Sequence, residues 1–244
     1  EERKKELIIL YEYEKVIDFS YSSDGRYMIF SAVQKGQSDL YLYNIAAASA
    51  RQLTNDRYDD LNPVFVDGTK SILFSSNRVD EKLRWEETED APVSMSKKTD
   101  LFLLLYNEKE SKLRRVTNTP LGSETKPMLT GTGRFAYLSD DNGIYNRYYG
   151  RFDSTISYVD TTVHYRYFSE TYPATNYSRN ILEHYVSPGS SWLSQIVFYK
   201  GRFLLQSEEI DDWQQDKSLS LQQTSFRSVL TEEAEIVKEE EKQE

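Results

Sequence analysis

Short segments with alternating apolar residues recur along the first part of this chain, and residues that favour tight turns separate them. Residues 19–31 (Phe-Ser-Tyr-Ser-Ser-Asp-Gly-Arg-Tyr-Met-Ile-Phe-Ser) predict a strand, an Asp-Gly turn and a second strand. Partial copies of this hairpin occupy residues 63–76 and 127–139. A hairpin that recurs along a chain indicates a repeat architecture.

The segments that follow the first two hairpins recur as well. An Asp-Leu-aromatic segment is found at residues 38–44 and again at 99–107. Residues 51–56 and 113–119 then carry a Leu-Thr or Val-Thr pair. Each unit therefore contains four short strands. The first unit has the length of about 40–45 residues that is typical of a propeller blade, and the second exceeds it because of one insertion. The sequence predicts an all-β fold, a β-propeller of four-stranded antiparallel blades.

The pattern divides the chain into successive units. It predicts an outer strand of a preceding blade over 1–15 (with a strand at 7–13), a blade over 16–56, a blade over 57–119 with an inserted loop over 78–98, a divergent blade over 120–172, a partial blade over 173–210, and an acidic tail or linker over 211–244. In the divergent blade, residues 144–152 and 158–168 are the expected third and edge strands. From Thr231 the tail has the composition of a solvated helix or a disordered linker.

About three to four blades can be counted, whereas propellers typically close with about 4–8 blades. Part of a larger ring is therefore expected, with a compact four-bladed closure as the alternative. Further blades of the same parent chain would complete the ring, and the first residue, which is not Met, suggests a piece of a longer polypeptide. An open arc would leave one blade face exposed to pairing.

Four motifs in the first two units carry a resemblance to a known family. They are Ser-x-Asp-Gly-Arg-x-x-x-Phe-Ser, Asp-Leu-Tyr-Leu-Tyr, Gln-Leu-Thr-Asn-Asp and Asp-Asp-Leu-Asn-Pro, all between residues 22 and 63. They resemble the WD-like repeat of TolB-type β-propellers, and residues 74–78 are similar to the usual end of that repeat's second strand. The whole chain is similar to large TolB-like cell-envelope proteins of Bacteroidota. The resemblance implies a periplasmic or outer-membrane-associated location. Gly68-Thr69 and Thr132-Gly133 depart from the Asp-Gly turn of the pattern.

Composition excludes several classes of function. The chain has 244 residues and no cysteine, which removes thiol catalysis, thiolate metal sites and disulfides. Its formal charge of −10 argues against nucleic acid as a partner, because such binding depends on Lys and Arg. No run of about 18 apolar residues is present, so no membrane span is predicted in this segment.

Catalytic motifs are not found. The nucleophile elbow Gly-x-Ser-x-Gly does not occur, and the two histidines, His164 and His184, have no spaced partner. Residues 140–143 (Asp-Asp-Asn-Gly) suggest calcium only superficially and are typical of a turn. We therefore expect no catalytic residue, no metal and no cofactor, and the chain is predicted not to be an enzyme.

Five residues remain as candidate sites. Asp59 and Asp60 lie in the segment that leads into a strand near one mouth of the channel in TolB-type propellers, where they either contact a partner or cap a turn. Trp85, in the inserted loop, is a second candidate for partner contact. Ser154 and Thr161 lie in short motifs that resemble the O-glycosylation motif of Bacteroidota envelope proteins.

The predicted function is a non-catalytic propeller that binds or scaffolds protein partners in a bacterial cell envelope. The alternative is an accessory propeller domain of a larger peptidase-like enzyme. A third possibility is a sugar- or ion-binding propeller, which only the 19 tyrosines support.

Overall fold

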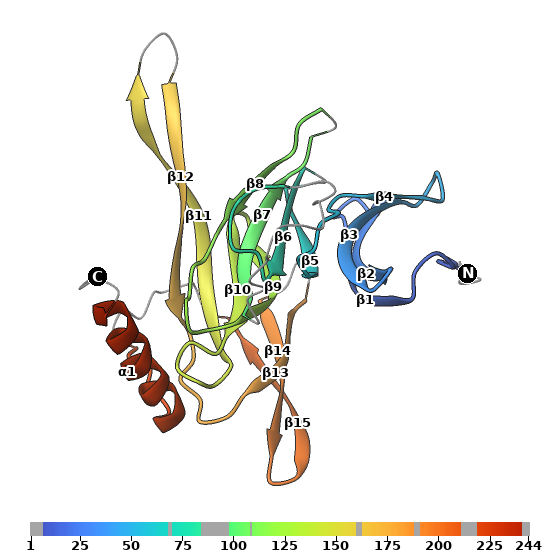
Figure 1. Cartoon of the computed structure of the whole chain (residues 1–244). Helices are drawn as coiled ribbons and strands as arrows, with labels where there is room; N and C mark the ends of the chain where they lie inside the picture. The colour runs from blue at the N-terminus through green and yellow to red at the C-terminus, as the bar shows by residue number, and fades with distance from the viewer. Residues whose placement is uncertain are drawn as a thin grey trace.

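The structure, a computed structural model, describes residues 7–67, 70–83, 98–107, 109–159, 163–187, 191–210 and 219–240. Over these residues the chain forms four antiparallel sheets in succession, which we call blades 1 to 4, followed by one helix (Figure 1). Blade 1 contains β1 (Lys15–Tyr21), β2 (Tyr27–Gln34), β3 (Gln37–Asn44) and β4 (Ser49–Gln52). Blade 2 contains β5 (Asp60–Asp67), β6 (Ser71–Ser76), β7 (Asp100–Leu105) and β8 (Lys112–Arg115). Blade 3 contains β9 (Glu124–Gly131), β10 (Arg134–Ser139), β11 (Asn146–Val159) and β12 (Val163–Pro173). Blade 4 contains β13 (Ile181–Val186), β14 (Trp192–Tyr199) and β15 (Arg202–Glu209), and the helix is α1 (Ser225–Glu240).

The predicted all-β propeller of antiparallel blades is confirmed. Blades 1 to 3 have four strands each, and blade 4 has three in the part of the chain that the structure describes. The predicted Asp24-Gly25 turn joins β1 to β2: Gly25 has a φ of 68°, and Asp24 Oδ1 accepts the Ser22 hydroxyl at 2.7 Å and the Arg26 amide at 3.0 Å. Asp24 therefore serves the turn rather than a reaction.

The hydrophobic core is distributed over the interfaces between successive blades. Ile29 and Leu40 of blade 1 pack against Phe74 and Phe102 of blade 2. The other face of blade 2 packs in the same way against blade 3, and blade 3 against blade 4. Each fully buried side chain of this kind contributes roughly 1.5–3 kcal/mol. Most of the stability therefore depends on each blade having a neighbour.

The first strands of the blades lie innermost and follow one another. β1 contacts β5, β5 contacts β9, and β9 contacts β13. Within the described ranges no comparable contact joins β13 to β1. Blades 1 and 4 are therefore the two ends of a series of four.

Residues 7–13 do not form the strand that their alternation predicts. Instead, Ile8, Leu10 and Tyr13 pack on the face of blade 1 that points away from blade 2. The Tyr13 ring lies edge-on to Tyr41, with 4.6 Å between ring centroids. Their apolar side chains are thus used for packing on blade 1.

Two further segments differ from the expected bounds. β11 and β12 form one long hairpin, paired from Tyr148↔Pro173 to Val159↔Val163, which projects beyond blade 3 (Figure 1). The helix α1 begins at Ser225, before the expected start at Thr231. Its first turn is attached to blade 3, because Arg227 donates to the Asp140 carbonyl oxygen at 2.6 Å. None of the described helical residues form a segment long and apolar enough to cross a bilayer.

Candidate functional site

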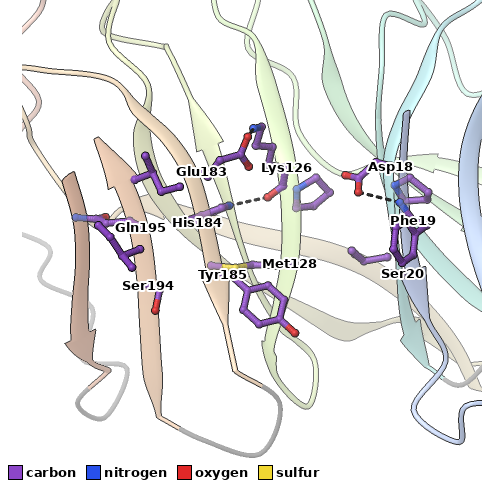
Figure 2. Close-up of a pocket in the computed structure, with 15 residues that line it drawn as sticks. Asp18, Phe19, Ser20, Lys126, Met128, Glu183, His184, Tyr185, Ser194 and Gln195 are labelled. Carbon is purple, nitrogen blue, oxygen red and sulfur yellow. Dashed lines mark hydrogen bonds and ion pairs between the residues drawn. The ribbon is translucent and has the colours of Figure 1, made fainter. Parts of the chain in front are cut away.

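An open cavity of about 390 Å³ lies among the inner strands (Figure 2). All four blades line it, and in blade 4 the lining includes β14 and Leu205 of β15. Phe19 comes from β1, Pro63 from β5, Met128 from β9 and Tyr185 from β13. Phe19 is 53% exposed and Tyr185 is 60% exposed. The cavity therefore presents apolar and aromatic surface that the protein itself does not cover.

Polar residues connect the inner strands at one side of this cavity. Asn62 donates to Asp18 Oδ2 at 2.9 Å and accepts the Thr125 hydroxyl at 2.9 Å. The Lys126 ammonium continues the chain of contacts to blade 4, where it binds the Leu182 carbonyl oxygen at 2.8 Å and the Glu183 carboxylate. One connected set of polar contacts thus runs from β1 to β13.

Asn62 and Lys126 occupy the same place in their blades. Each precedes a proline, lies where the pairing register shifts, and has a positive φ, 51° for Asn62 and 53° for Lys126. A bulge of this kind bends the strand and re-aims a side chain. The local backbone therefore directs these two polar side chains toward the neighbouring blade.

His184 links β13 to β9 at the wall of the cavity. Its Nε2 lies 2.7 Å from the Lys126 carbonyl oxygen (Figure 2). Because a carbonyl oxygen only accepts, Nε2 carries the proton. Burial lowers the pKa of His184 to about 3. His184 is therefore a neutral structural contact at neutral pH.

The predicted pair Asp59 and Asp60 divides into two different roles. Arg78 binds both oxygens of Asp60, at 2.5 Å and 3.1 Å, and also binds Asp56 at 2.5 Å. The Arg78, Asp56 and Asp60 side chains are fully buried. The structure thus assigns the Asp60 carboxylate to an internal ion pair that it does not offer to a partner.

Asp59 lies nearer the surface. Its Oδ1 accepts the Ser38 hydroxyl at 2.6 Å, and its amide donates to Asn77 Oδ1 at 2.8 Å. These bonds join blade 1 to blade 2. Partner contact by Asp59 stays a prediction.

Three candidate residues remain: Ser154, Trp85 and Thr161. Ser154 is in β11, with its backbone opposite Tyr167 on the projecting hairpin. Trp85 and Thr161 lie outside the described residues. Modification of Ser154 and Thr161, and partner contact by Trp85, therefore stay predictions.

In three blades a threonine hydroxyl accepts a hydrogen bond from a backbone amide of the third strand. Thr54 Oγ1 accepts the Leu40 amide at 3.0 Å, and Thr117 Oγ1 accepts the Leu101 amide at 2.8 Å. Thr175 Oγ1 accepts the Arg147 amide at 2.9 Å in the same way. Thr54 and Thr117 belong to the Leu-Thr and Val-Thr pairs noted in the sequence. Thr175 was missed because it belongs to an Ala-Thr pair that follows the long β11–β12 hairpin, which breaks the spacing of the repeat.

Two buried carboxyl groups near these threonines have raised pKa values. Burial, followed by the negative charges of Asp60 and Asp56, raises the pKa of Asp39 to about 7. Burial also raises the pKa of Glu124 to about 7, although the hydrogen bonds from Thr117 and Thr119 lower it.

Among the described residues, no group of three His, Cys, Asp or Glu side chains is arranged to hold a metal ion.

Comparisons with known proteins identify the fold. No protein-family model matches the sequence. No curated protein sequence matches it significantly either. TolB from Acinetobacter baumannii matches 79% of this chain at a TM-score of 0.50 and 17% identity, and the match covers 40% of TolB. A putative TolB from Agrobacterium tumefaciens matches 79% at a TM-score of 0.54 and 16% identity, and 61% of it is covered. The tricorn protease is more distant, with a TM-score of 0.47, 11% identity and coverage of 80% of this chain and 23% of the protease.

This chain spans less than two thirds of either TolB structure. The likeness nevertheless covers 79% of this chain and agrees with the blade pattern of the sequence. Over about four fifths of its length, the chain has the fold of the TolB β-propellers.

Proposed function

We propose that this chain is a non-catalytic, protein-binding or scaffolding β-propeller of a bacterial cell-envelope assembly, periplasmic or outer-membrane-associated. The observation that carries the proposal is the inner-strand cavity, in which Phe19 and Tyr185 are exposed beside charged Asp18, Lys126 and Glu183. Buried aromatic anchors within a polar rim supply most of the binding energy of protein interfaces. The TolB-like fold supports an envelope location for such an interface.

The partner is a protein segment that inserts an apolar side chain between Phe19 and Tyr185. Its polar groups meet the Asp18, Lys126 and Glu183 side chains at the rim. Asp59 and Trp85 would contribute outside the cavity. The resemblance to large TolB-like envelope proteins of Bacteroidota is part of the same proposal.

The proposal also includes further blades of the same parent chain. The face of blade 4 that points away from blade 3 exposes Tyr185, Phe198, Phe203 and Leu205. The corresponding faces of blades 1 to 3 are covered by the next blade. This difference supports a larger ring.

Affinity capture from envelope extracts tests the proposal. The chain is used as bait beside a Phe19→Asp/Tyr185→Asp variant, which places charge in the cavity. Phe226→Asp is the matched control, because Phe226 is 70% exposed on α1 and does not line the cavity. We expect a defined envelope protein with the chain and with the control but not with the double variant. Recovery of no envelope protein above a bead control, or equal recovery with all three baits, would contradict the proposal.

A further inference from the structure

Among the described residues, blade 4 ends on an open edge. In blades 1 to 3 the third strand is paired on its outer side by β4, β8 or β12. In blade 4 the third strand, β15, is the last strand of its sheet among the described residues, and all eight of its residues are exposed. Figure 1 shows the β14–β15 hairpin projecting away from the other blades. An edge of this kind is a template for pairing with another strand.

The hairpin geometry shows which backbone groups face that edge. Lys200 and Gly201 have φ values of 48° and 77°, as in the two-residue type I′ turn, so Tyr199 and Arg202 form the closing pair. At the other end, the Ile210 amide donates to the Ser191 carbonyl oxygen at 2.6 Å. Hydrogen-bonded pairs alternate along an antiparallel ladder. The even-numbered residues therefore bond to β14, and Phe203, Leu205 and Ser207 direct their backbone N–H and C=O groups to the open edge.

The sequence of β15 is complementary to itself when read in the opposite direction. With Leu205 opposite Leu205 of the partner subunit, Arg202 lies opposite Glu208 of the partner subunit. Phe203 then lies opposite Ser207 of the partner subunit. The outward-directed residues face one another in this register, so every free N–H and C=O between 203 and 207 finds a partner.

We propose that β15 is a self-association strand: two copies of this chain pair their β15 strands antiparallel about a two-fold axis at Leu205. The two blades 4 become one continuous six-stranded sheet. The contact is isologous, so it closes as a dimer. Backbone hydrogen bonds supply the affinity, as in other strand-addition interfaces. Arg202 of each copy then lies beside Glu208 of the partner subunit and favours this register, although Glu208 Oε1 also accepts from Arg147 of its own chain at 2.8 Å. The paired groups are the backbone N–H and C=O groups on the outer edge of β15, whereas the Leu205 side chain also lines the cavity.

Sedimentation velocity of the intact chain and two variants tests the dimer. Leu205→Pro removes one outward N–H without removing a bond to β14, and proline is tolerated at such edge positions. Phe198→Lys is the matched control, because Phe198 is 47% exposed on the same face of blade 4 but lies in the central strand. We expect dimers of the chain and of Phe198→Lys, and monomers of Leu205→Pro. A chain that stays monomeric up to about 100 µM would overturn the proposal. Dissociation by Phe198→Lys as complete as that by Leu205→Pro would also overturn it, since the contact would then be the face and not the edge.

Cross-linking tests the register and does not depend on the proline variant folding. The chain has no cysteine, so a single cysteine can be introduced without a background. Directly opposed residues have Cα atoms about 5.5 Å apart, within the range of a disulfide. Two copies of residue 203 would lie about 13 Å apart along the strands. We expect Leu205→Cys to form a covalent dimer under mild oxidation and Phe203→Cys not to. Equal cross-linking of the two variants, or none with Leu205→Cys, would refute the register about Leu205.

Discussion

Arg78 forms a buried ion pair at the junction of blades 1 and 2. It is fully buried with Asp56 and Asp60, and its guanidinium lies 5.4 Å from the centre of the Tyr58 ring. Two buried carboxylates tolerate this environment because one cation binds both. Asp56 follows β4, Asp60 begins β5 and Arg78 follows β6, so the ion pair holds two blades together.

Replacing Arg78 by methionine leaves two buried carboxylates without a cation. We expect Arg78→Met to lose about 3–5 kcal/mol of the free energy of unfolding, because an uncompensated buried charge is costly. Urea unfolding followed by circular dichroism measures this loss. Arg26→Met is the control: Arg26 and Asp24 are 3.9 Å apart and largely exposed, so no measurable change is expected. A loss no larger than that of the control would contradict a stabilising role for Arg78.

Glu124 occupies the position in blade 3 that Asp60 has in blade 2. Both residues open an inner strand and lie opposite a serine that ends the second strand, Ser139 or Ser76. Asp60 has Arg78, whereas the Glu124 carboxyl group is bonded by the hydroxyls of Thr117 and Thr119. Hydroxyls leave the charge uncompensated, so burial keeps the proton on Glu124 up to about pH 7.

The pH dependence of stability should reveal this proton. Between pH 4.5 and about 7 the folded protein keeps the Glu124 proton, which the unfolded chain has released. Folding therefore binds a proton in this window, and the free energy of unfolding falls as pH rises. Glu124→Gln should reduce this fall in urea titrations, and adding Asp39→Asn, whose carboxyl pKa is also raised to about 7, should reduce it further.

The difference between variant and wild type must be compared, because His184 has the opposite effect. Its pKa is lowered from 6.5 to about 3, so its contribution to stability is present above pH 6.5 and is lost as pH falls toward 3. Subtraction removes this shared contribution. An unchanged pH dependence in Glu124→Gln would show that Glu124 is already ionised in the folded protein at acidic pH.

At this scale the sequence predicts residues whose role is local. Asp24 is bonded within its own turn, so the Asp-Gly pair was sufficient to assign it. Asp60 is different, because its partner Arg78 is 18 residues away and becomes a neighbour only when β5 pairs with β6. The sequence around Asp59 and Asp60 does not indicate that Arg78 would be their neighbour.

Among the elements, β10 and β11 depend on a glycine. Gly150 lies opposite Phe135, and a Cβ atom at Gly150 would come within 2.2 Å of the Phe135 ring. That ring also packs against Phe152, with 4.7 Å between centroids. Only glycine leaves space for Phe135 between blades 2 and 3.

A Gly150→Ala substitution should therefore overpack this interface and cost about 1–3 kcal/mol of stability. Gly131→Ala is the control, because a Cβ at Gly131 meets no atom within 4 Å. Thermal unfolding distinguishes the two variants. Adding Phe135→Leu should recover part of the loss in Gly150→Ala. A Gly150→Ala variant as stable as Gly131→Ala would show that the ring moves aside without cost.

The hairpins of blades 1 and 2 were predictable because their pairing is between neighbours in sequence. The segment 7–13 was not, because alternation shows which side chains are apolar but not whether a strand lies beside them. In the structure the side chains of Ile8, Leu10 and Tyr13 pack on blade 1, and residues 11–12 form a turn. The sequence predicted strands at 144–152 and 158–168, which are shorter than or shifted from β11 and β12. The two strands continue to pair with each other beyond Arg151, where the pairing of β11 with β10 ends, and alternation does not show where a partner strand ends.

At the scale of the whole molecule, function depends on contacts between blades. The sequence predicted the repeat and the antiparallel blades, and the larger ring stays a prediction. It did not predict the cavity, because Phe19, Lys126 and Tyr185 come from three different blades and no motif connects them. The candidate residue Asp60 is buried in the ion pair between blades 1 and 2, where it supports the arrangement of blades that forms the cavity.

The most direct test of the account is site-specific photo-cross-linking from the cavity. A photoreactive phenylalanine analogue replaces Tyr185 in one variant and Phe226 in another, and each intact chain is irradiated in envelope extract. We expect the analogue at Tyr185 to give one discrete adduct with an envelope protein, and the analogue at Phe226 to give none. No adduct from Tyr185, or the same adducts from both positions, would contradict the conclusion that the inner-strand cavity is a protein-binding site.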